Sequence, residues 1–243
     1  MAFNQKLDNP ETVAALIDHT LLKPEAAAPD IARLCAEALE FKFASVCVNP
    51  CWVRSAAEAV SGSSVRVCTV IGFPLGASDA RTKIAEANVA LSSGAKEIDM
   101  VQNIGALRSG NFHLVHKEIA DLADIAHSCG AILKVILETC LLTQEEKVTA
   151  CRLAANAQAD FVKTSTGFST GGATAADVRL MRNTVGEQIG VKASGGIRSL
   201  DTLREMVAVG ANRIGTSSGV NILRELSSAA PSAPESRPVG TAY

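Results

Sequence analysis

Two lysines end short apolar segments of this chain. Lys163 closes the run Asp-Phe-Val-Lys and precedes Thr-Ser-Thr-Gly, and Lys192 follows a valine and precedes Ala-Ser-Gly-Gly. Lysine is almost never fully buried unless its charge is compensated, and a desolvated amine beside a second cation has a lowered pKa, which makes it a nucleophile. The pair therefore indicates covalent chemistry through an imine, the Schiff base of a lysine with a carbonyl group.

The spacing of the two lysines, 192 − 163 = 29 residues, corresponds to one strand and one helix. This spacing predicts adjacent strands and similar height, the arrangement in which each amine lowers the pKa of the other. One lysine alone at a strand end is better interpreted as a salt-bridge partner or a rim residue. For both together, the nucleophile interpretation is favoured.

A carboxylate is expected near these lysines. In the segment Glu97 to Val101, alternation sends Glu97, Asp99 and Val101 to one face of a strand, so that face carries charge. An isolated strand aspartate is more often an ion-pair partner. Imine chemistry, however, needs a group that moves protons to and from the carbinolamine and the enamine, and Asp99 is the candidate.

Apolar segments recur along the chain, and each is followed by an amphipathic stretch. The predicted strands are residues 16–20, 44–48, 65–71, 97–101, 132–138, 160–163, 191–194 and 213–215. Eight strands alternating with helices predict a (β/α)₈ TIM barrel, a fold that uses about 250 residues as a single domain. A doubly wound sheet needs fewer strands and usually a Gly-x-Gly-x-x-Gly after the first, which this chain lacks.

Several helices have readable ends. Prolines 29 and 50 are expected to open helices over 30–41 and 51–60. Ser78 or Asp79 can cap a helix to about Ser93, with Gly94 as its left-handed stop. The pairs Thr143/Glu146 and Thr174/Asp177 have the spacing of capping boxes.

Barrel enzymes work at the carboxyl ends of their strands, so polar residues there are candidates for the site. Besides the residues above, the candidates are Asp18, Cys47, Asn49, Gln102, Asn103, Lys134, Glu138, Thr164, Ser165 and Ser194. Lys134 is assigned a supporting electrostatic role, with an ordinary ion pair equally expected. Cys47 is most often plain core, and a thiol facing the pocket would react with aldehydes.

Two glycine-rich turns suggest phosphate recognition. The first, 194–197, follows the seventh strand, and the second, 215–219, follows the eighth and opens a final helix near 220–226. Backbone N–H groups at a helix N-terminus bind anions, and barrels often hold a phosphate at these two loops. Each motif is weak by itself, but two in the expected order are a stronger indication.

Composition excludes several classes of function. Hydrophobic residues make up 47% of the chain and aromatic residues only 4%, which is typical of an aliphatic core under a parallel sheet. A net charge of −2 with no basic run argues against nucleic acid or an anionic membrane as partner. No stretch approaches the roughly 18 apolar residues of a membrane span, and the N-terminus is polar, so we expect a cytoplasmic protein acting on a small molecule.

No metal or cofactor is expected. The seven cysteines are scattered and contain no Cys-x-x-Cys, so they indicate neither a disulfide framework nor a zinc site. The histidines, at 19, 113, 116 and 127, do not converge with carboxylates at ligand spacing and are predicted to be surface or capping residues. From Ser227 onward, Ser, Ala, Pro and Gly dominate, which predicts a barrel domain over 1–226 and a mobile tail over 227–243.

Taken together, six motifs resemble the deoxyribose-phosphate aldolases, a family of class I aldolases. They begin at residues 17 (IDHTLLKP), 97 (EIDMV), 133 (LKVILET), 160 (DFVKTSTG), 191 (VKASGGIR) and 213 (RIGTSS), and the similarity runs from about residue 12 to 226. The combination is far more specific than any single motif.

The resemblance implies reversible cleavage of 2-deoxy-D-ribose 5-phosphate to D-glyceraldehyde 3-phosphate and acetaldehyde, in deoxynucleoside catabolism. It implies that Lys163 forms the Schiff base, that Lys192 perturbs it and relays protons, and that Asp99 is the acid/base group. The positions that match the phosphate pocket are Gly167, Gly195, Gly196, Gly215, Ser217 and Ser218. Short aldehydes and a phosphorylated sugar would be the ligands, and a homodimer is one expected assembly.

Two positions differ among members of this family. Some members have a lysine that reaches the substrate where this chain has Phe168, which bears on its preference for phosphorylated or unphosphorylated aldehydes. Some also end in a tyrosine that folds into the site, and Tyr243 is the last residue and the only tyrosine here. The alternatives to an aldolase are a phosphosugar isomerase or decarboxylase without an imine, and a non-catalytic phosphosugar-binding regulator.

Overall fold

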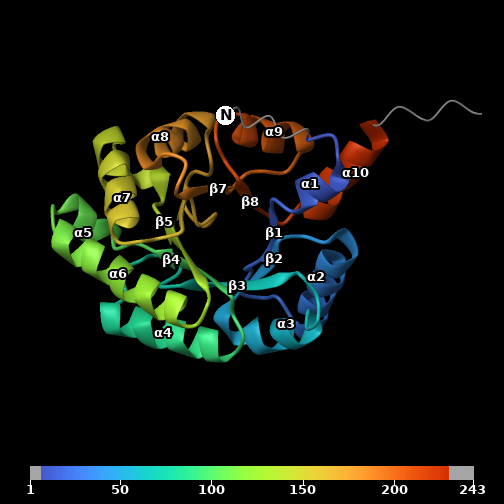
Figure 1. The fold of residues 1–243 in the computed structure, drawn as a ribbon, viewed down its shortest axis with the longest axis horizontal. Coiled ribbons are helices and arrows are strands. Elements are labelled where there is room, and N and C mark those ends of the chain that lie inside the picture. The colour runs from blue at the N-terminus through green and yellow to red at the C-terminus, as the bar shows by residue number, and fades with distance from the viewer. Residues whose placement is uncertain (1–6, 230–243) are drawn as a thin grey trace, which may run out of the picture.

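Eight short parallel strands form the centre of the protein, and helices surround them (Figure 1). The structure is a computed structural model that describes residues 7–229. The strands are β1 (Ile17–Leu21), β2 (Ser45–Val48), β3 (Arg66–Ile71), β4 (Glu97–Val101), β5 (Ile132–Ile136), β6 (Phe161–Lys163), β7 (Gly190–Ser194) and β8 (Arg213–Thr216). Each agrees with its predicted segment, and the differences lie at the ends.

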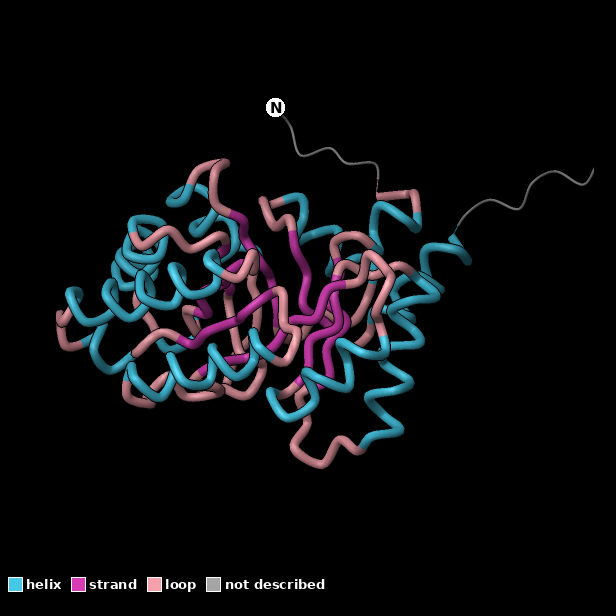
Figure 2. Tube along the Cα trace, turned by 60° about the horizontal axis from the view of Figure 1, so that its bottom comes forward, coloured by secondary structure: helices cyan, strands magenta, loops and turns pink. Residues whose placement is uncertain are grey.

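The helices alternate with the strands and cover the outside of the sheet (Figure 2). They are α1 (Pro10–Ala14), α2 (Ala28–Phe41), α3 (Val53–Ala59), α4 (Ala80–Ser92), α5 (Ile104–Arg108), α6 (Phe112–Ser128), α7 (Gln144–Asn156), α8 (Ala175–Val185), α9 (Leu200–Ala208) and α10 (Gly219–Ala229), with 3₁₀ turns η1 (Pro50–Trp52) and η2 (Thr139–Leu141). None of these helices is long and apolar enough to cross a membrane.

The sheet closes on itself. Each strand pairs with the next in the chain, and β8 pairs back with β1 through the register Ile17 to Ile214. The predicted (β/α)₈ TIM barrel is therefore confirmed. Closure brings the carboxyl ends of all eight strands to one mouth, where the predicted site residues meet.

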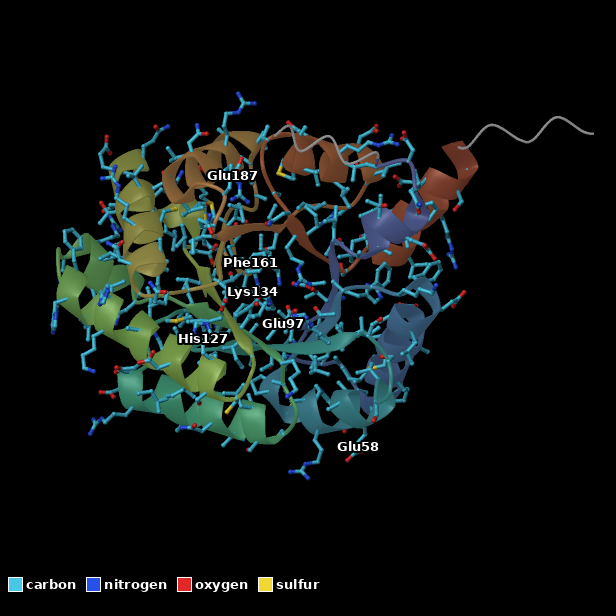
Figure 3. All side chains as sticks on the ribbon, viewed as in Figure 1. Glu58, Glu97, His127, Lys134, Phe161 and Glu187 are labelled. Atoms are coloured by element: carbon cyan, nitrogen blue, oxygen red, sulfur yellow. The ribbon has the colours of Figure 1, made fainter. Side chains whose placement is uncertain are left out.

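Alternation along the strands separates an apolar outer face from a charged inner one. On β4, Ile98 and Met100 belong to the large core between sheet and helices. Glu97 and Asp99, at the alternate positions, are fully buried inside the barrel, as predicted. Figure 3 shows Glu97 near the middle of the barrel with Lys134, whereas Glu58 lies at its outer edge.

Local signals account for most helix ends. Asp79 caps α4 by accepting a hydrogen bond from the Arg81 N–H at 2.9 Å, and Gly94 follows with a φ of +108°. Thr143 and Glu146 form the predicted capping box. These short-range hydrogen bonds depend only on neighbouring residues, so the sequence reveals them.

Two helix predictions need correction. The helix expected over 51–60 is split into the turn η1 and the shorter helix α3, because the chain after Pro50 first forms a 3₁₀ turn. At α8, Thr174 caps the Asp177 N–H, but the second half of the box is absent: the Asp177 carboxylate instead accepts from Lys147 on α7 at 2.6 Å. A tertiary ion pair thus replaces a local hydrogen bond.

The predicted boundary at residue 226 lies inside a helix. Helix α10 continues to Ala229, and its last turn includes Ser227 and Ser228. Their hydroxyls donate to the carbonyls of Leu223 and Arg224 at 3.0 and 2.8 Å, so each serine bonds within the helix. The remainder of the predicted tail, including Tyr243, lies outside the described residues.

Candidate active site

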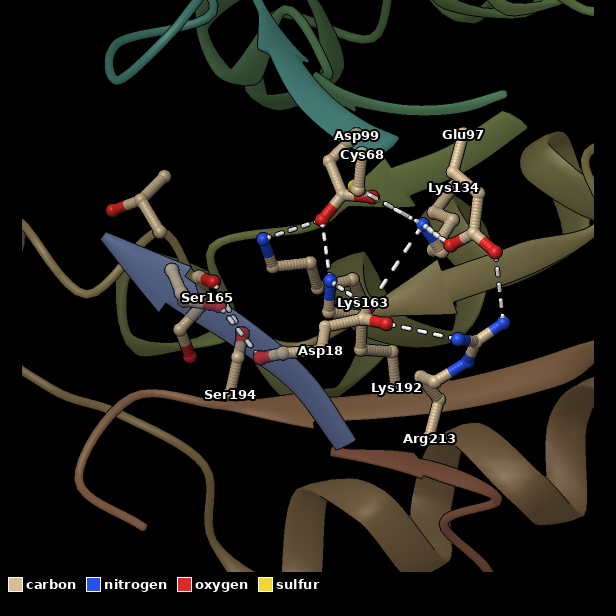
Figure 4. A network of polar contacts seen from close by, with 12 residues as sticks. Asp18, Cys68, Glu97, Asp99, Lys134, Lys163, Ser165, Lys192, Ser194 and Arg213 are labelled. Atoms are coloured by element: carbon tan, nitrogen blue, oxygen red, sulfur yellow. Dashed lines mark hydrogen bonds and ion pairs between the residues drawn. The ribbon is translucent and has the colours of Figure 1, made fainter. Parts of the chain in front are cut away.

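Asp99 lies at the centre of the charged barrel interior and contacts three lysines. Its Oδ2 is 2.8 Å from the Nζ of Lys163 and 2.7 Å from that of Lys192, and its Oδ1 is 2.8 Å from that of Lys134. Strand register produces this arrangement, because Lys163 pairs with Lys192 across β6 and β7, and Asp99 pairs with Lys134 across β4 and β5. Figure 4 shows the contacts. The predicted convergence of Lys163, Lys192 and Asp99 is a feature of the structure.

Three further side chains, Asp18, Glu97 and Arg213, complete the charged interior of the barrel. The Oδ2 of Asp18 lies 2.5 Å from Lys192 Nζ, and its Oδ1 lies 2.9 Å from an Arg213 nitrogen. Glu97 bonds to Arg213 at 3.1 Å and to Lys134 at 2.6 Å. We call these seven side chains the barrel cluster: Asp18, Glu97, Asp99, Lys134, Lys163, Lys192 and Arg213.

Burial and charge compete in setting the pKa values of the barrel cluster. Burial alone would raise the pKa of Asp99, but Lys134, Lys163 and Lys192 hold it well below the ordinary value. Burial alone would lower the pKa of Lys192, yet Asp18 and Asp99 raise it above its ordinary value. The expectation that each lysine lowers the pKa of the other is therefore wrong for Lys192, which stays a cation beside Lys163.

Lys163 is the cluster lysine that opens onto a cavity. A cavity of about 430 Å³ lies at the carboxyl ends of the strands, lined by Thr20, Leu21, Leu22, Lys23, Lys163, Thr166, Gly167, Phe168, Ser194, Gly195, Gly196, Ile197, Arg198, Gly215, Thr216 and Ser217. Lys192 and Asp99 lie beneath it, with 1% and 0% of their side-chain surface exposed. A small ligand in this cavity would meet the Lys163 amine and not that of Lys192.

A larger hollow of about 830 Å³ lies at the opposite end of the barrel, lined by the first residues of several strands, among them Phe161, Gly190 and Arg213. None of the described residues that line it is a lysine. The larger hollow and the cavity that Lys163 lines therefore lie at opposite ends of the barrel. We place the candidate site at the carboxyl end by chemistry, because Lys163, the predicted nucleophile, lines the cavity there and contacts Asp99.

Five of the six predicted phosphate-pocket residues line the smaller cavity: Gly167, Gly195, Gly196, Gly215 and Ser217. Gly167, Gly195 and Gly196 have φ values of +83°, +87° and +82°, the left-handed region that favours glycine. Ser218 is not among the lining residues, and its N–H donates to the Thr216 hydroxyl at 2.9 Å.

Gly215 makes room for a lysine. A Cβ at this position would lie 3.0 Å from the Cε of Lys192 and 3.0 Å from the Cβ of Ser194. The absence of a side chain at Gly215 therefore lets Lys192 extend to Asp18 and Asp99. Gly215 was predicted only as part of the phosphate pocket, and its contact with Lys192 was not predicted.

Glu138, predicted only as a strand-end candidate, holds the loop that carries Gly167. Its carboxylate accepts from the backbone N–H of Thr166 at 3.3 Å and forms a short hydrogen bond with the Thr166 hydroxyl. That hydroxyl also accepts from the Phe168 N–H at 3.0 Å. Glu138 itself has a positive φ of 57°. It therefore shapes the wall of the cavity without lining it.

Cys47 is buried inside the barrel and does not line the cavity. It pairs in register with Cys68, whose thiol donates to Asp99 Oδ1 at 3.2 Å. Ligand atoms of Cys47, Cys68 and Asp99 lie within 4.8 Å of one another. Both Asp99 oxygens already accept from lysines, however, so a metal cation here would face ammonium groups, and the geometry does not favour one.

Several other strand-end residues serve the fold. Asn103 caps α5 by accepting from the Ala106 N–H at 2.9 Å. Asn49 and Gln102 donate to the carbonyls of Leu22 and Leu137 at 3.2 and 3.0 Å. Leu22 and Leu137 directly follow the ends of β1 and β5, so these hydrogen bonds hold the loops after the two strands in place. A polar residue at a strand end is thus, by itself, weak evidence for a place in the active site.

His19 was wrongly predicted to be a surface or capping residue. It is 2% exposed, and its Nε2 lies 2.7 Å from Glu37 on α2. Burial lowers the pKa of His19 below its ordinary value, although Glu37 opposes this. Alternation along β1 places His19 on the helix side of the sheet, opposite the inward Asp18.

Lys23 and Arg198 were not predicted for the site, although both line the cavity. Each is an exposed cation in a loop that follows a strand, Lys23 after β1 and Arg198 after β7. A basic residue next to a glycine-rich loop is the signal that would have found Arg198.

The fold and the site define a class: a (β/α)₈-barrel enzyme with a buried lysine pair at the mouth of the barrel. A sequence model described as DeoC/LacD family aldolase matches residues 12–228. The chain therefore belongs to the DeoC/LacD family of aldolases.

Named relatives agree with this family. The chain is 59% identical over 216 residues to a deoxyribose-phosphate aldolase from Lysinibacillus sphaericus, covering 89% of this chain and 96% of the relative. It is 60% identical over 207 residues to the enzyme of that name from Brevibacillus brevis, covering 85% and 93%. Among solved structures, the deoxyribose phosphate aldolase from Aeropyrum pernix, described as a tetramer, superposes with a TM-score of 0.86 at 36% identity, covering 93% and 97%.

Proposed function

We propose that the protein is a deoxyribose-phosphate aldolase that cleaves 2-deoxy-D-ribose 5-phosphate to D-glyceraldehyde 3-phosphate and acetaldehyde through an imine on Lys163. The single observation that carries the mechanism is that Lys163, hydrogen bonded to Asp99 at 2.8 Å, faces the 430 Å³ cavity while Lys192 is sealed beneath it. An isomerase or decarboxylase is not supported by the named relatives.

The reaction begins when the neutral amine of Lys163 attacks the C1 aldehyde. The carbinolamine loses water and leaves a protonated imine, which withdraws electrons from C2. When the C3 hydroxyl loses its proton, C3 becomes a carbonyl and the C2–C3 bond breaks. Its electron pair forms the enamine, and D-glyceraldehyde 3-phosphate leaves. Protonation of C2 and hydrolysis of the imine then release acetaldehyde and the Lys163 amine.

Asp99 and Lys192 divide the proton transfers. The lowered pKa of Asp99 keeps it a carboxylate at rest, so it accepts hydrogen bonds from the amines of Lys163 and Lys192. Lys192 remains an ammonium group, and it shares Oδ2 of Asp99 with Lys163. Protons therefore pass between the lysines through one oxygen, with Lys192 as donor and Asp99 as relay.

The phosphate binds at the glycine-rich side of the cavity. Gly195, Gly196 and Ser217 offer backbone groups there, and Arg198 brings a positive charge. Ser218 directly precedes α10, and we include it as a further proposed contact of the phosphate. Phe168 also lines the cavity, and its ring meets that of Phe73 edge-on with the ring centroids 5.2 Å apart. Phe168 itself contributes apolar surface to the cavity.

A labelling experiment tests the proposal. Incubation with deoxyribose 5-phosphate and borohydride should fix a two-carbon adduct on Lys163, detected by peptide mass spectrometry. Lys23 is the matched control, because it is an exposed lysine that lines the same cavity. Labelling of Lys23 without Lys163, or acetaldehyde release that survives Lys163→Arg, contradicts the proposal. Ribose 5-phosphate should release no acetaldehyde.

Three finer expectations stay predictions. They are the entry of Tyr243 into the site, a homodimeric assembly and a cytoplasmic location.

A further inference from the structure

Arg198 lies between two hollows. It lines the 430 Å³ cavity that Lys163 also lines, and it lines a neighbouring hollow of about 650 Å³. The other described residues that line this second hollow are Asn221, Arg224, Glu225 and Ser228, all on α10. We call it the Arg224 hollow. Because Arg198 lines both, the Arg224 hollow adjoins the side of the cavity at which the phosphate is proposed to bind.

The backbone on both sides of Arg198 is held in place. The carbonyl of Ile197 accepts a hydrogen bond from the Thr216 hydroxyl at 2.6 Å, and the N–H of Leu200 donates to the Glu225 carboxylate at 2.7 Å. Thr216 lines the cavity, whereas Glu225 lines the Arg224 hollow. The loop that carries Arg198 is therefore bonded to one wall of each hollow, which fixes the start of its side chain between them.

Helix α10 connects the phosphate side of the cavity with the Arg224 hollow. The helix begins at Gly219, just after Ser217, which lines the cavity. Asn221, Arg224 and Ser228 follow at intervals of three and four residues, the spacing that places side chains on one face of a helix. This face of α10 therefore begins beside the proposed phosphate contacts and leads away from the cavity.

The side chains of the Arg224 hollow suit a compact anion. None of the described residues that line it is apolar, so the hollow offers no surface on which a nucleobase or an alkyl chain could pack. Glu225 brings a negative charge, but its Oε2 already accepts from Leu200. Among the residues that the structure describes, no carboxylate pairs with the guanidinium of Arg198 or of Arg224. Guanidinium groups bind phosphate in a bidentate manner, so a phosphate group is the anion that fits best.

We propose that the substrate site continues past Arg198 into the Arg224 hollow, and that the enzyme accepts 2-deoxy-D-ribose with a diphosphate on its C5 oxygen. This inference rests on the proposed function. The first phosphate binds at the glycine-rich side of the cavity, and the second lies between Arg198 and Arg224. The bonds that form and break are those of the proposed reaction. The C2–C3 bond breaks, the products are acetaldehyde and D-glyceraldehyde 3-diphosphate, and the diphosphate itself is unchanged.

The second phosphate should affect KM and not kcat. It is remote from the bond that breaks, so its contacts stabilise the bound substrate and the transition state equally. We expect Arg224→Gln to raise KM for the diphosphate about fivefold, the upper range for an exposed ion pair. Arg224→Glu should raise it further, because like charges repel. KM for the monophosphate should stay unchanged in Arg224→Gln, since Arg224 does not line the cavity.

Acetaldehyde release from deoxyribose 5-phosphate and from deoxyribose 5-diphosphate measures these effects in the full chain. The wild type should cleave both, with a KM for the diphosphate no higher than that for the monophosphate. Phosphorus NMR checks that the diphosphate stays intact during the assay. Arg179→Gln is the matched control, because Arg179 is an exposed arginine on α8 that lines neither hollow. It removes the same charge and should leave both KM values unchanged.

The outcomes separate this inference from the proposed function. If the wild type releases no acetaldehyde from deoxyribose 5-phosphate, the proposed function fails and this inference fails with it. If the wild type cleaves the monophosphate but not the diphosphate, the Arg224 hollow is not part of the substrate site. An unchanged KM for the diphosphate in Arg224→Gln also overturns the inference. Equal rises in Arg224→Gln and Arg179→Gln would show an effect of net charge and would overturn it as well.

Discussion

Lys163 and Lys192 share one oxygen, Oδ2 of Asp99, at 2.8 and 2.7 Å. The two amines are register partners on β6 and β7, yet their surroundings differ. Lys192 also contacts Asp18 and is sealed under the cavity, while Lys163 faces the cavity. Two lysines at equal height thus have separate roles, because Asp18 lies on the side of Lys192.

Asp99→Asn should remove the proton relay and weaken the buried cluster. We expect kcat to fall by about 10²- to 10⁴-fold and the free energy of unfolding to fall by about 3–5 kcal/mol. Steady-state kinetics and denaturant unfolding measure the two effects. Glu118→Gln is the matched control, because Glu118 pairs with another buried lysine, Lys83, at 2.8 Å outside the barrel. The Glu118→Gln variant should have a lower free energy of unfolding and an unchanged kcat. An Asp99→Asn enzyme with normal kcat would rule out the relay.

Gly215→Ala should impair turnover through Lys192. The added Cβ would lie 3.0 Å from Lys192 Cε, which displaces the ammonium group from Asp99. We expect kcat to fall by about 10- to 100-fold, since small misplacements of catalytic groups have effects of that size. Gly105→Ala is the control, because its Cβ would meet nothing closer than 3.6 Å. Equal activity of the two variants would contradict a steric role for Gly215.

Phe168→Lys should shift preference towards the phosphorylated substrate. A cation on the cavity wall would pair with the phosphate, and an exposed ion pair contributes about 0.2–1 kcal/mol. We expect KM for deoxyribose 5-phosphate to fall about 1.4- to fivefold, with no fall for unphosphorylated deoxyribose. Phe112→Lys makes the same change in charge on α6, away from the cavity, where Phe112 is 45% exposed. If both variants lower KM equally, the effect is one of net charge and not of the cavity wall.

His19 should make the fold sensitive to mild acid. Burial lowers its pKa from the ordinary value of 6.5, so the unfolded chain binds the proton more readily than the folded one. Stability is then fully present above about pH 6.5 and is lost as the pH falls below it. Thermal unfolding from pH 7.5 to 5.5 measures this loss. His19→Gln should show a shallower dependence on pH over that interval, and an identical slope in both proteins would refute the assignment.

Local residue patterns were enough to predict the barrel and the candidate lysines. The eight apolar segments, the capping residues at Asp79 and Thr143 and the alternation along β4 depend on neighbouring residues, so local physics reveals them. The charge on the inner face of the barrel also follows from that alternation. The reactive chemistry was therefore predictable from the sequence.

The surroundings of each charged group depend on contacts that form when the barrel closes. Closing the barrel brings Asp18 beside Lys192, and so reverses the expected direction of the Lys192 pKa. Closing the barrel also buries His19 between the sheet and the helices, in contact with Glu37, and brings Gly215 next to Lys192. These contacts join residues far apart in the chain, and a pKa depends on every charge nearby in space. The spacing of residues in the sequence predicts which side chains are candidates, and their contacts in the folded barrel determine their pKa values.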